Sequence, residues 1–391
     1  MKKLIGTAML AALLATSAFA EGFSFGAWNN MNYVIANNDS NSVESAFMQP
    51  WGPDGARFGS FIISADSENA GFKAELQFNN WGGPSFGQVF SYVKPIEQIQ
   101  LIFGFTDQNY LRSDNCAKMW DYWRPTALNL GEGLTFDEFE VSGIGLVVTP
   151  IESLKIFAGY DVDLAGKKGK LHEQIGRSGK LGAAYTIGDI GTVKAGVWAN
   201  GKKTNKDGEK KDLVKVEAAF DLTAIEGMFL TVGAKIPLGG TYGKKTVDGM
   251  DIYINTETVQ VNAGVALNLI ENLGIQLNFA SKINAPKLKD NDKDGNFGFA
   301  LMLGADYTFA ETWKVFAAVG YANDVYNSIE ADGKTTKDQI SFGVGIEKSW
   351  SNASLGIAVE CMTNDGDKYF IDAHNDTAFN WAIPIRMNVS F

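Results

Sequence analysis

Residues 270–280, IENLGIQLNFA, hold the sequence pattern that decides the fold. After the Ile270-Glu271 pair, apolar residues resume two positions later and recur at every second residue, at Leu273, Ile275, Leu277 and Phe279. The residues between them are small or polar, which predicts a β-strand with one apolar and one polar face. An alternation of about ten residues has the length of a strand that crosses an outer membrane. Strands of soluble β-sandwiches are usually nearer five or six residues.

The same unit recurs along the chain, which indicates a repetitive β-protein. Short acidic interruptions stand at Ile96-Glu97, Ile151-Glu152, Ile225-Glu226, Ile270-Glu271 and Ala310-Glu311. Asp-Gly pairs, which favour turns because both residues tolerate positive φ, lie inside long polar stretches. They are Asp54-Gly55, Asp207-Gly208, Asp248-Gly249, Asp294-Gly295, Asp332-Gly333 and Asp365-Gly366. Through the second half of the chain the two kinds of turn alternate, which predicts short turns at one rim of a barrel and long loops at the other.

About eighteen strands are predicted, and sixteen stays open because the four strands before residue 95 alternate least cleanly. They run near 22–36, 57–66, 71–79, 85–93, 99–107, 138–148, 154–163, 178–186, 191–200, 212–222, 228–237, 256–268, 273–283, 296–309, 313–322, 338–348, 354–362 and 378–391. The predicted fold class is all-β: a transmembrane, antiparallel up-and-down β-barrel formed by residues 21–391 as one domain.

The first twenty residues predict a secretory signal peptide. Lys2 and Lys3 form a basic start, residues 4–14 are an apolar run, and Ala18-Phe19-Ala20 is a small-x-small cleavage site, so residues 1–20 are expected to be removed by cleavage after Ala20. Loss of the two lysines takes the formal net charge from −11 to −13, which argues against nucleic-acid binding.

The apolar strand faces are predicted to meet lipid. Beyond the N-terminus no run reaches the roughly 20 apolar residues of a spanning helix, and no amphipathic helices are present to cover long strands in a soluble protein. Aromatic residues near the short turns are expected to form a girdle; they are Tyr92, Tyr160, Tyr185, Tyr307 and Trp313. The alternative is a soluble barrel or sandwich whose apolar faces point inward.

The last strand carries a resemblance to a known family. Phe379, Trp381, Ile383, Ile385, Met387, Val389 and Phe391 alternate to a terminal phenylalanine, and this resembles the closing strand of bacterial outer-membrane porins. The resemblance implies that Phe391 marks the chain for the outer-membrane assembly machinery and that the barrel lets small hydrophilic solutes and ions diffuse passively. Porins of this kind are often homotrimers. An apolar face looks the same against lipid or a neighbouring copy, so the oligomeric state stays open.

The polar faces are predicted to line a water-filled pore. A lysine or arginine facing lipid at mid-membrane costs about 2 to 4 kcal/mol, so the charged strand residues belong on the other face. A dry interior could hold them only if nearly all were paired. The predicted wall residues are Lys73, Glu75, Lys155, Asp161, Lys180, Lys194, Lys215, Glu217, Asp221, Lys235, Lys282, Asp306, Lys314, Glu347, Glu360 and Arg386.

The connection at about 108–137 is the third external loop of the predicted barrel. In general porins this loop folds into the barrel and narrows it, so the resemblance implies a constriction here. The candidate residues are Arg112, Asp114, Trp120, Asp121, Tyr122, Trp123 and Arg124. Charges in such a loop, facing a lysine-bearing wall, could set up a transverse field. The alternative is a loop packed at the surface by its aromatic residues.

Other functions stay open or are disfavoured. A carbohydrate-specific porin, which would stack sugars along an aromatic path, could use Trp51, Trp81, Trp120, Tyr122, Trp123 and Trp198. A structural or adhesive barrel would have an occluded lumen and no conductance. An enzyme is not predicted, since His172 and His374 lie in loops with no evident catalytic geometry.

No cofactor or metal site is predicted. Residues 290–295 match the start of a calcium loop, but Leu301 stands where a bidentate glutamate is needed. A Cys116 to Cys361 disulfide is not expected, because the pattern puts Cys361 on the apolar face of a strand and a chain of this length needs no disulfide to build a core.

Overall fold

A computed structural model of the chain describes residues 23–37, 46–48, 57–79, 83–106, 110–111, 139–161, 178–204, 210–238, 242–247, 250–255, 258–285, 296–323, 338–363 and 379–391. Its strands are β1 Phe23–Asn37, β2 Ala46–Met48, β3 Arg57–Asp66, β4 Ala70–Asn79, β5 Gly83–Ile96, β6 Ile99–Thr106, β7 Val141–Ile151, β8 Leu154–Asp161, β9 Gly179–Ile187, β10 Gly191–Thr204, β11 Lys210–Leu222, β12 Met228–Pro237, β13 Tyr242–Val247, β14 Met250–Asn255, β15 Val259–Ile270, β16 Leu273–Ala285, β17 Asn296–Phe309, β18 Trp313–Ala322, β19 Gln339–Ser349, β20 Ala353–Thr363 and β21 Phe379–Ser390. In this part of the chain, no helix is long and apolar enough to cross a membrane.

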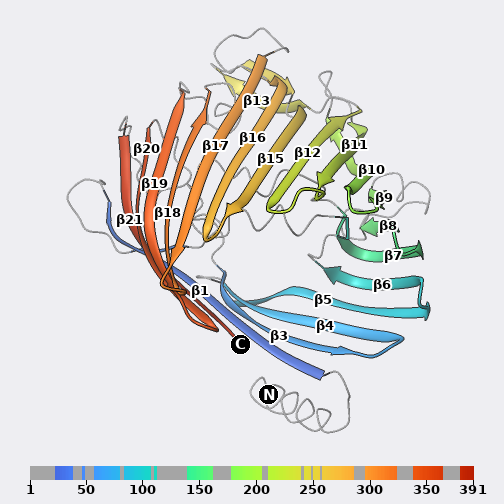
Figure 1. Ribbon diagram of the computed structural model, residues 1–391. Helices are drawn as coiled ribbons and strands as arrows, with labels where there is room; N and C mark the ends of the chain where they lie inside the picture. Colours follow the sequence, from blue (N-terminus) through green and yellow to red (C-terminus); the bar gives the residue numbers. More distant parts are fainter. Residues whose placement is uncertain are drawn as a thin grey trace.

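Eighteen of these strands form one closed antiparallel barrel (Figure 1). Neighbours in the ring follow chain order, and β1 closes it by pairing with β3 on one side and β21 on the other. At the seam, the Phe391 amide donates to the Ala27 carbonyl at 2.7 Å, and the Ala27 amide donates back at 3.0 Å. The predicted fold class and the count of eighteen are confirmed, and the sixteen-strand alternative is wrong.

The predicted acidic turns connect consecutive strands at one rim. Ile96 pairs with Ile99, Ile151 with Leu154 and Ile270 with Leu273, so two residues make each of these turns. Asn272 adopts a φ of 64°, a conformation that asparagine tolerates better than most residues. The six predicted Asp-Gly pairs fall outside the described residues.

Two elements stand apart from the barrel strands. β2 adds three residues beside β1, and β13 and β14 form a separate hairpin in the connection between β12 and β15. This hairpin was not predicted from the sequence. Its strands have six residues each, which is too short for the ten-residue alternation used to find the others.

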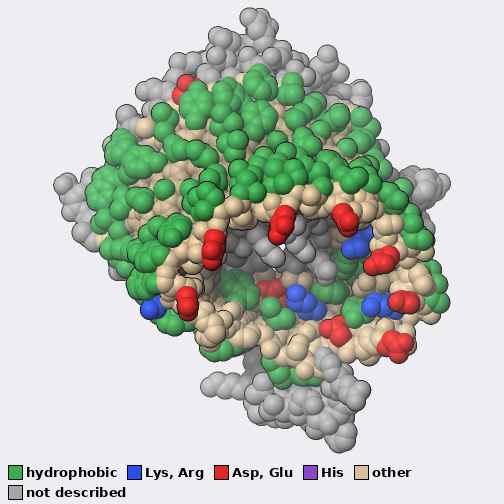
Figure 2. All heavy atoms as spheres, viewed as in Figure 1, with side chains coloured by type: hydrophobic (Ala, Val, Ile, Leu, Met, Phe, Trp, Pro, Cys, Tyr) green, Lys and Arg blue, Asp and Glu red, His purple; other side chains and the backbone are tan. Residues whose placement is uncertain are grey.

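The two faces of the barrel wall differ in the way that the alternation predicts. Along β10, Val193 and Val197 point outward and are 42% and 37% exposed, whereas Lys194 and Trp198, each directly after one of these valines, point inward and are buried. On the side seen in Figure 2, the outer wall is mostly hydrophobic, while acidic and basic side chains gather around and within the opening.

Two of the predicted girdle residues are placed differently. Tyr92 points inward with Phe90 on β5, and its hydroxyl donates to Asp66 at 2.8 Å. The prediction failed because β5 carries aromatic residues on both faces. Tyr160 is the second-last residue of β8, at the end away from the short turn. Tyr185, Tyr307 and Trp313 lie beside short turns as predicted.

Candidate functional site

The predicted wall residues lie on the inward face of the sheet, opposite the exposed apolar residues. Cross-strand pairing sets them in rows; one runs from Gly196 on β10 through Glu217, Lys235 and Gln260 to Lys282 on β16. Most of them are buried or half-buried; among the most buried are Glu75, Asp161, Lys180, Lys194, Glu217, Asp221, Glu347 and Glu360. The barrel interior is therefore polar and carries both signs of charge.

Ion pairs between lysine and carboxylate side chains bridge neighbouring strands on this inner wall. The Nζ atoms lie 2.9 Å from the carboxylate in Lys180–Asp161, 2.5 Å in Lys194–Asp221, 3.1 Å in Lys235–Glu217 and 3.6 Å in Lys314–Asp306. The partners in each pair belong to adjacent strands, so the pairs run along the wall and none of them joins opposite walls. Lysine and carboxylate thus compensate each other locally, as buried charges must.

Trp198 is the centre of a second group on the wall. Its indole N–H donates to Glu217 at 2.9 Å, and the ammonium groups of Lys215 and Lys235 lie 4.9 Å and 5.8 Å from its ring centroid. The residue is only 2% exposed. Its ring therefore offers no free face on which a sugar could stack. The other residues of the hypothetical aromatic path, Trp51, Trp81, Trp120, Tyr122 and Trp123, lie outside the described residues.

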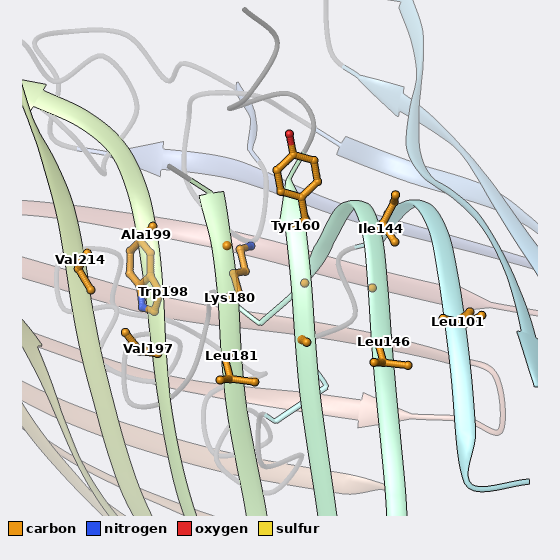
Figure 3. Close-up of a pocket in the computed structure, with 14 residues that line it drawn as sticks. Leu101, Ile144, Leu146, Tyr160, Lys180, Leu181, Val197, Trp198, Ala199 and Val214 are labelled. Carbon is orange, nitrogen blue, oxygen red and sulfur yellow. The ribbon is translucent and has the colours of Figure 1, made fainter. Parts of the chain in front are cut away.

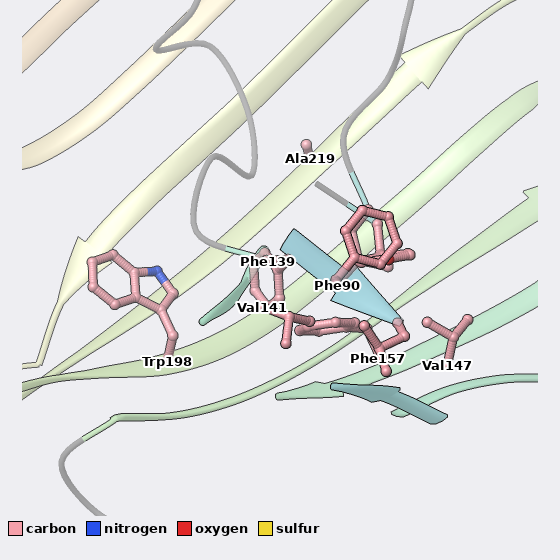
Figure 4. Packing of buried hydrophobic residues seen from close by; sticks show 10 residues of the cluster. Phe90, Phe139, Val141, Val147, Phe157, Trp198 and Ala219 are labelled. Carbon is pink, nitrogen blue, oxygen red and sulfur yellow. The ribbon is translucent and has the colours of Figure 1, made fainter. Parts of the chain in front are cut away.

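Both ends of the third external connection pack inside the barrel. β6 ends at Thr106 and β7 begins at Val141. Tyr110 stacks on Phe157 with ring centroids 5.5 Å apart, and Phe139 meets the same ring edge-on at 6.0 Å. The Tyr110 amide donates to the Phe139 carbonyl at 3.2 Å, which ties the two ends together. These side chains belong to a buried cluster on the inner face (Figure 4).

Two glycines on adjacent strands make room for Phe139. Gly182 on β9 pairs with Gly196 on β10, and both face inward. A Cβ atom on Gly196 would lie 2.2 Å from Phe139 Cζ, and one on Gly182 would lie 2.8 Å from Phe139 Cε1 and 2.5 Å from Leu111 Cδ1. Any larger residue at either position would therefore displace the ring. We call the surface formed by these two glycines the glycine seat.

Polar contacts hold the same end of the connection. Lys180 donates to the Glu140 carbonyl at 3.2 Å while also pairing with Asp161, and Asp161 accepts from the Ser142 amide at 3.2 Å. Burial, reinforced by the nearby Tyr92, raises the pKa of Tyr110 to about 12, so its hydroxyl stays protonated at neutral pH.

The seven candidate constriction residues, Arg112, Asp114, Trp120, Asp121, Tyr122, Trp123 and Arg124, fall outside the described residues. So do residues 1–20, both histidines and Cys116, whereas Cys361 is a free thiol on β20. Leu111, Phe139, Phe157 and the glycine seat were not identified from the sequence. A partial signal was present, because glycine occupies inward positions on the consecutive strands β9 and β10, but nothing local identifies Phe139, which precedes the earlier strand β7, as the residue above them.

A hollow of about 610 Å³ lies on the other face of this part of the wall (Figure 3). Residues of β6 to β11 line it, among them the outward-facing Leu146, Ala158, Tyr160 and Leu181. The hollow is apolar and opens away from the lumen, so it does not belong to a solute path. Among the described residues, no group of three or more His, Cys, Asp or Glu could hold a metal ion.

No protein-family model matches the chain, and no curated protein matches its sequence. Solved structures, however, match the fold of the chain. OccK5 (OpdH) of Pseudomonas aeruginosa has a TM-score of 0.54 at 13% identity, with 95% of this chain and 99% of that chain covered. DcaP, an outer-membrane channel of Acinetobacter baumannii, has a TM-score of 0.52 at 10% identity, with 95% and 99% covered. An anion-selective porin from Comamonas acidovorans has a TM-score of 0.51 at 11% identity, with 95% and 99% covered.

Matches at identities this low show a shared fold only. The chain therefore has the fold of bacterial outer-membrane porins, which the resemblance of its last strand predicted.

Proposed function

We propose that this barrel is a passive, non-enzymatic channel of the outer membrane for small hydrophilic solutes and ions, narrowed by its third connection. The observation that carries the proposal is the packing of Tyr110 and Phe139 against Phe157 inside the barrel. A connection whose two ends are anchored on the inner wall starts and finishes in the lumen. From this anchor we expect the central residues, 112–138, to project into the lumen, where they would reduce its free cross-section.

The inner wall supports passage of polar solutes. The wall carries charges of both signs, several of them paired between adjacent strands, so a hydrated solute meets hydrogen-bonding groups of both signs. The apolar outer face and the closed ring of strands both support a bilayer setting. In lipid, only helices and closed barrels leave no backbone group without a hydrogen bond. We expect export through a signal peptide removed after Ala20 and recognition of Phe391 by the assembly machinery; a trimer is consistent with the fold but is not required by it.

The test is the conductance of the purified, refolded barrel in a planar bilayer, with and without maltodextrins. Deletion of residues 112–128 is the decisive variant. Stable conductance that sugar leaves unchanged and that the deletion enlarges supports the proposal. Conductance that the deletion leaves unchanged contradicts the constriction, block by sugar favours a carbohydrate-specific channel, and no conductance favours a structural barrel.

A further inference from the structure

The outward face of the barrel carries a cation at the short-turn rim. Among cations whose side chains the structure describes, Lys348 on β19 alone points outward, in line with the exposed residues Val344 and Phe342. Lys314 on β18, the cross-strand partner of Glu347, is on the inward face beside Asp306. A lysine on the lipid face is costly at mid-membrane and is tolerated near the interface, which is where Lys348 lies.

Two tryptophans flank the Lys348 ammonium. Its Nζ lies 4.9 Å from the ring centroid of Trp313 and 5.6 Å from that of Trp350. Trp313 is the cross-strand partner of Lys348, and its ring stacks on Phe309 with centroids 6.5 Å apart. We call Trp313, Lys348 and Trp350 the rim site.

Within the part of the chain that the structure describes, no carboxylate forms an ion pair with Lys348. Glu347, the adjacent residue, points into the barrel and is 1% exposed. The two rings attract the cation through their π-faces but carry no negative charge. Trp350 is half exposed, so the site is open outward. Indole rings are favoured at membrane interfaces because their N–H groups reach polar partners while the ring body stays in apolar surroundings.

We infer that the rim site binds the phosphate of an anionic phospholipid in the leaflet next to the short turns. The ammonium supplies the charge, and the two indoles hold it at headgroup depth and can donate to phosphate oxygens. A zwitterionic headgroup brings its own ammonium, which competes with Lys348 for the phosphate, so lipids with a net negative headgroup are preferred. This inference rests on the bilayer setting of the proposed function and is independent of conductance.

The test is competition between phosphatidylglycerol and phosphatidylcholine of equal chain length for the barrel in mixed micelles, with bound lipid counted by native mass spectrometry. The wild type is expected to prefer phosphatidylglycerol about fivefold, the preference that one lysine near an anionic surface supplies. Lys348→Gln should bring the ratio close to one, and Lys348→Arg should keep it. Lys314→Gln removes the same charge at the same height on the lumen side, and this variant should also keep the preference for phosphatidylglycerol.

A wild type without preference, or a Lys348→Gln variant with the wild-type ratio, would overturn the inference. If the glutamine variant does not fold, the wild type in 1 M salt gives the same test, because screening should lower its preference. A barrel that selects phosphatidylglycerol but never conducts would remove the proposed channel function and leave the rim site standing.

Discussion

Replacement of Phe139 by alanine should release the end of the third connection from the barrel wall and widen the pore. The Phe139 side chain is completely buried, against Phe157 and the glycine seat. Truncation of a buried phenylalanine costs about 3 to 5 kcal/mol. No side chain of the wall can fill the space, because the positions below the ring are Gly182 and Gly196.

The lost free energy makes local opening of the connection easier and leaves the stability of the barrel unchanged. The strands keep all of their ladder hydrogen bonds when this end detaches, so the opening is a sub-global event. A loss of about 3 to 5 kcal/mol raises the opening equilibrium by roughly a hundredfold to several thousandfold. A connection that is closed in nearly all wild-type molecules should then be open in a large fraction of variant molecules.

The assay is single-channel conductance in planar bilayers, together with hydrogen exchange of the peptides that span residues 107–140. The Phe139→Ala channel should show larger or more frequently fluctuating openings and faster exchange in those peptides. Phe103→Ala is the matched control, because Phe103 on β6 points outward and is 48% exposed. Unchanged conductance and exchange in the Phe139 variant, or an equal change in the control, would refute the reasoning.

Three further predictions follow from the same geometry. Gly196→Ala places a carbon 2.2 Å from the ring of Phe139, so it should enlarge conductance in the same direction as the truncation, measured in the same bilayer assay. Lys180→Met leaves the Asp161 carboxylate buried without its partner and should destabilise the surrounding wall by about 3 to 5 kcal/mol in urea unfolding, with Asp161→Asn restoring part of the loss. Removal of Phe391 deletes the two seam hydrogen bonds with β1 and should slow barrel closure. Heat-modifiable gel mobility should then show a lower folded fraction during refolding, and a refolding rate equal to that of the wild type would contradict the prediction.

A pH prediction follows for Tyr110, whose burial raises its pKa to about 12 from the ordinary value of 10.0. The folded state therefore favours the protonated phenol. Its contribution to anchoring is complete below pH 10 and is lost as the pH rises toward 12. Hydrogen exchange at residues 107–140, corrected for intrinsic rate, should accelerate over that interval, and Tyr110→Phe should abolish the acceleration.

Much of the architecture could be predicted because it is written in local patterns. Alternation with a period of two identifies a strand and its two faces, and an Ile-Glu pair followed by resumed alternation identifies a two-residue turn. These rules found all of the barrel strands and placed the charged residues on one face. They failed at Tyr92, where both faces of β5 are aromatic, and at the β13–β14 hairpin, whose strands are short.

The candidate site required the tertiary structure because it depends on contacts across strands and between distant segments. The sequence alone establishes that Lys180 and Trp198 point inward, but only strand register makes them neighbours. In the same way, nothing local in the chain reveals that Phe139 sits over Gly182 and Gly196, some forty to sixty residues further on. Period-two alternation is a property of each strand's own backbone, whereas the fit of a loop end into a glycine seat depends on how closed strands curve around a common interior. Strand faces and turns were therefore determined locally, and the anchoring of the third connection was decided by packing.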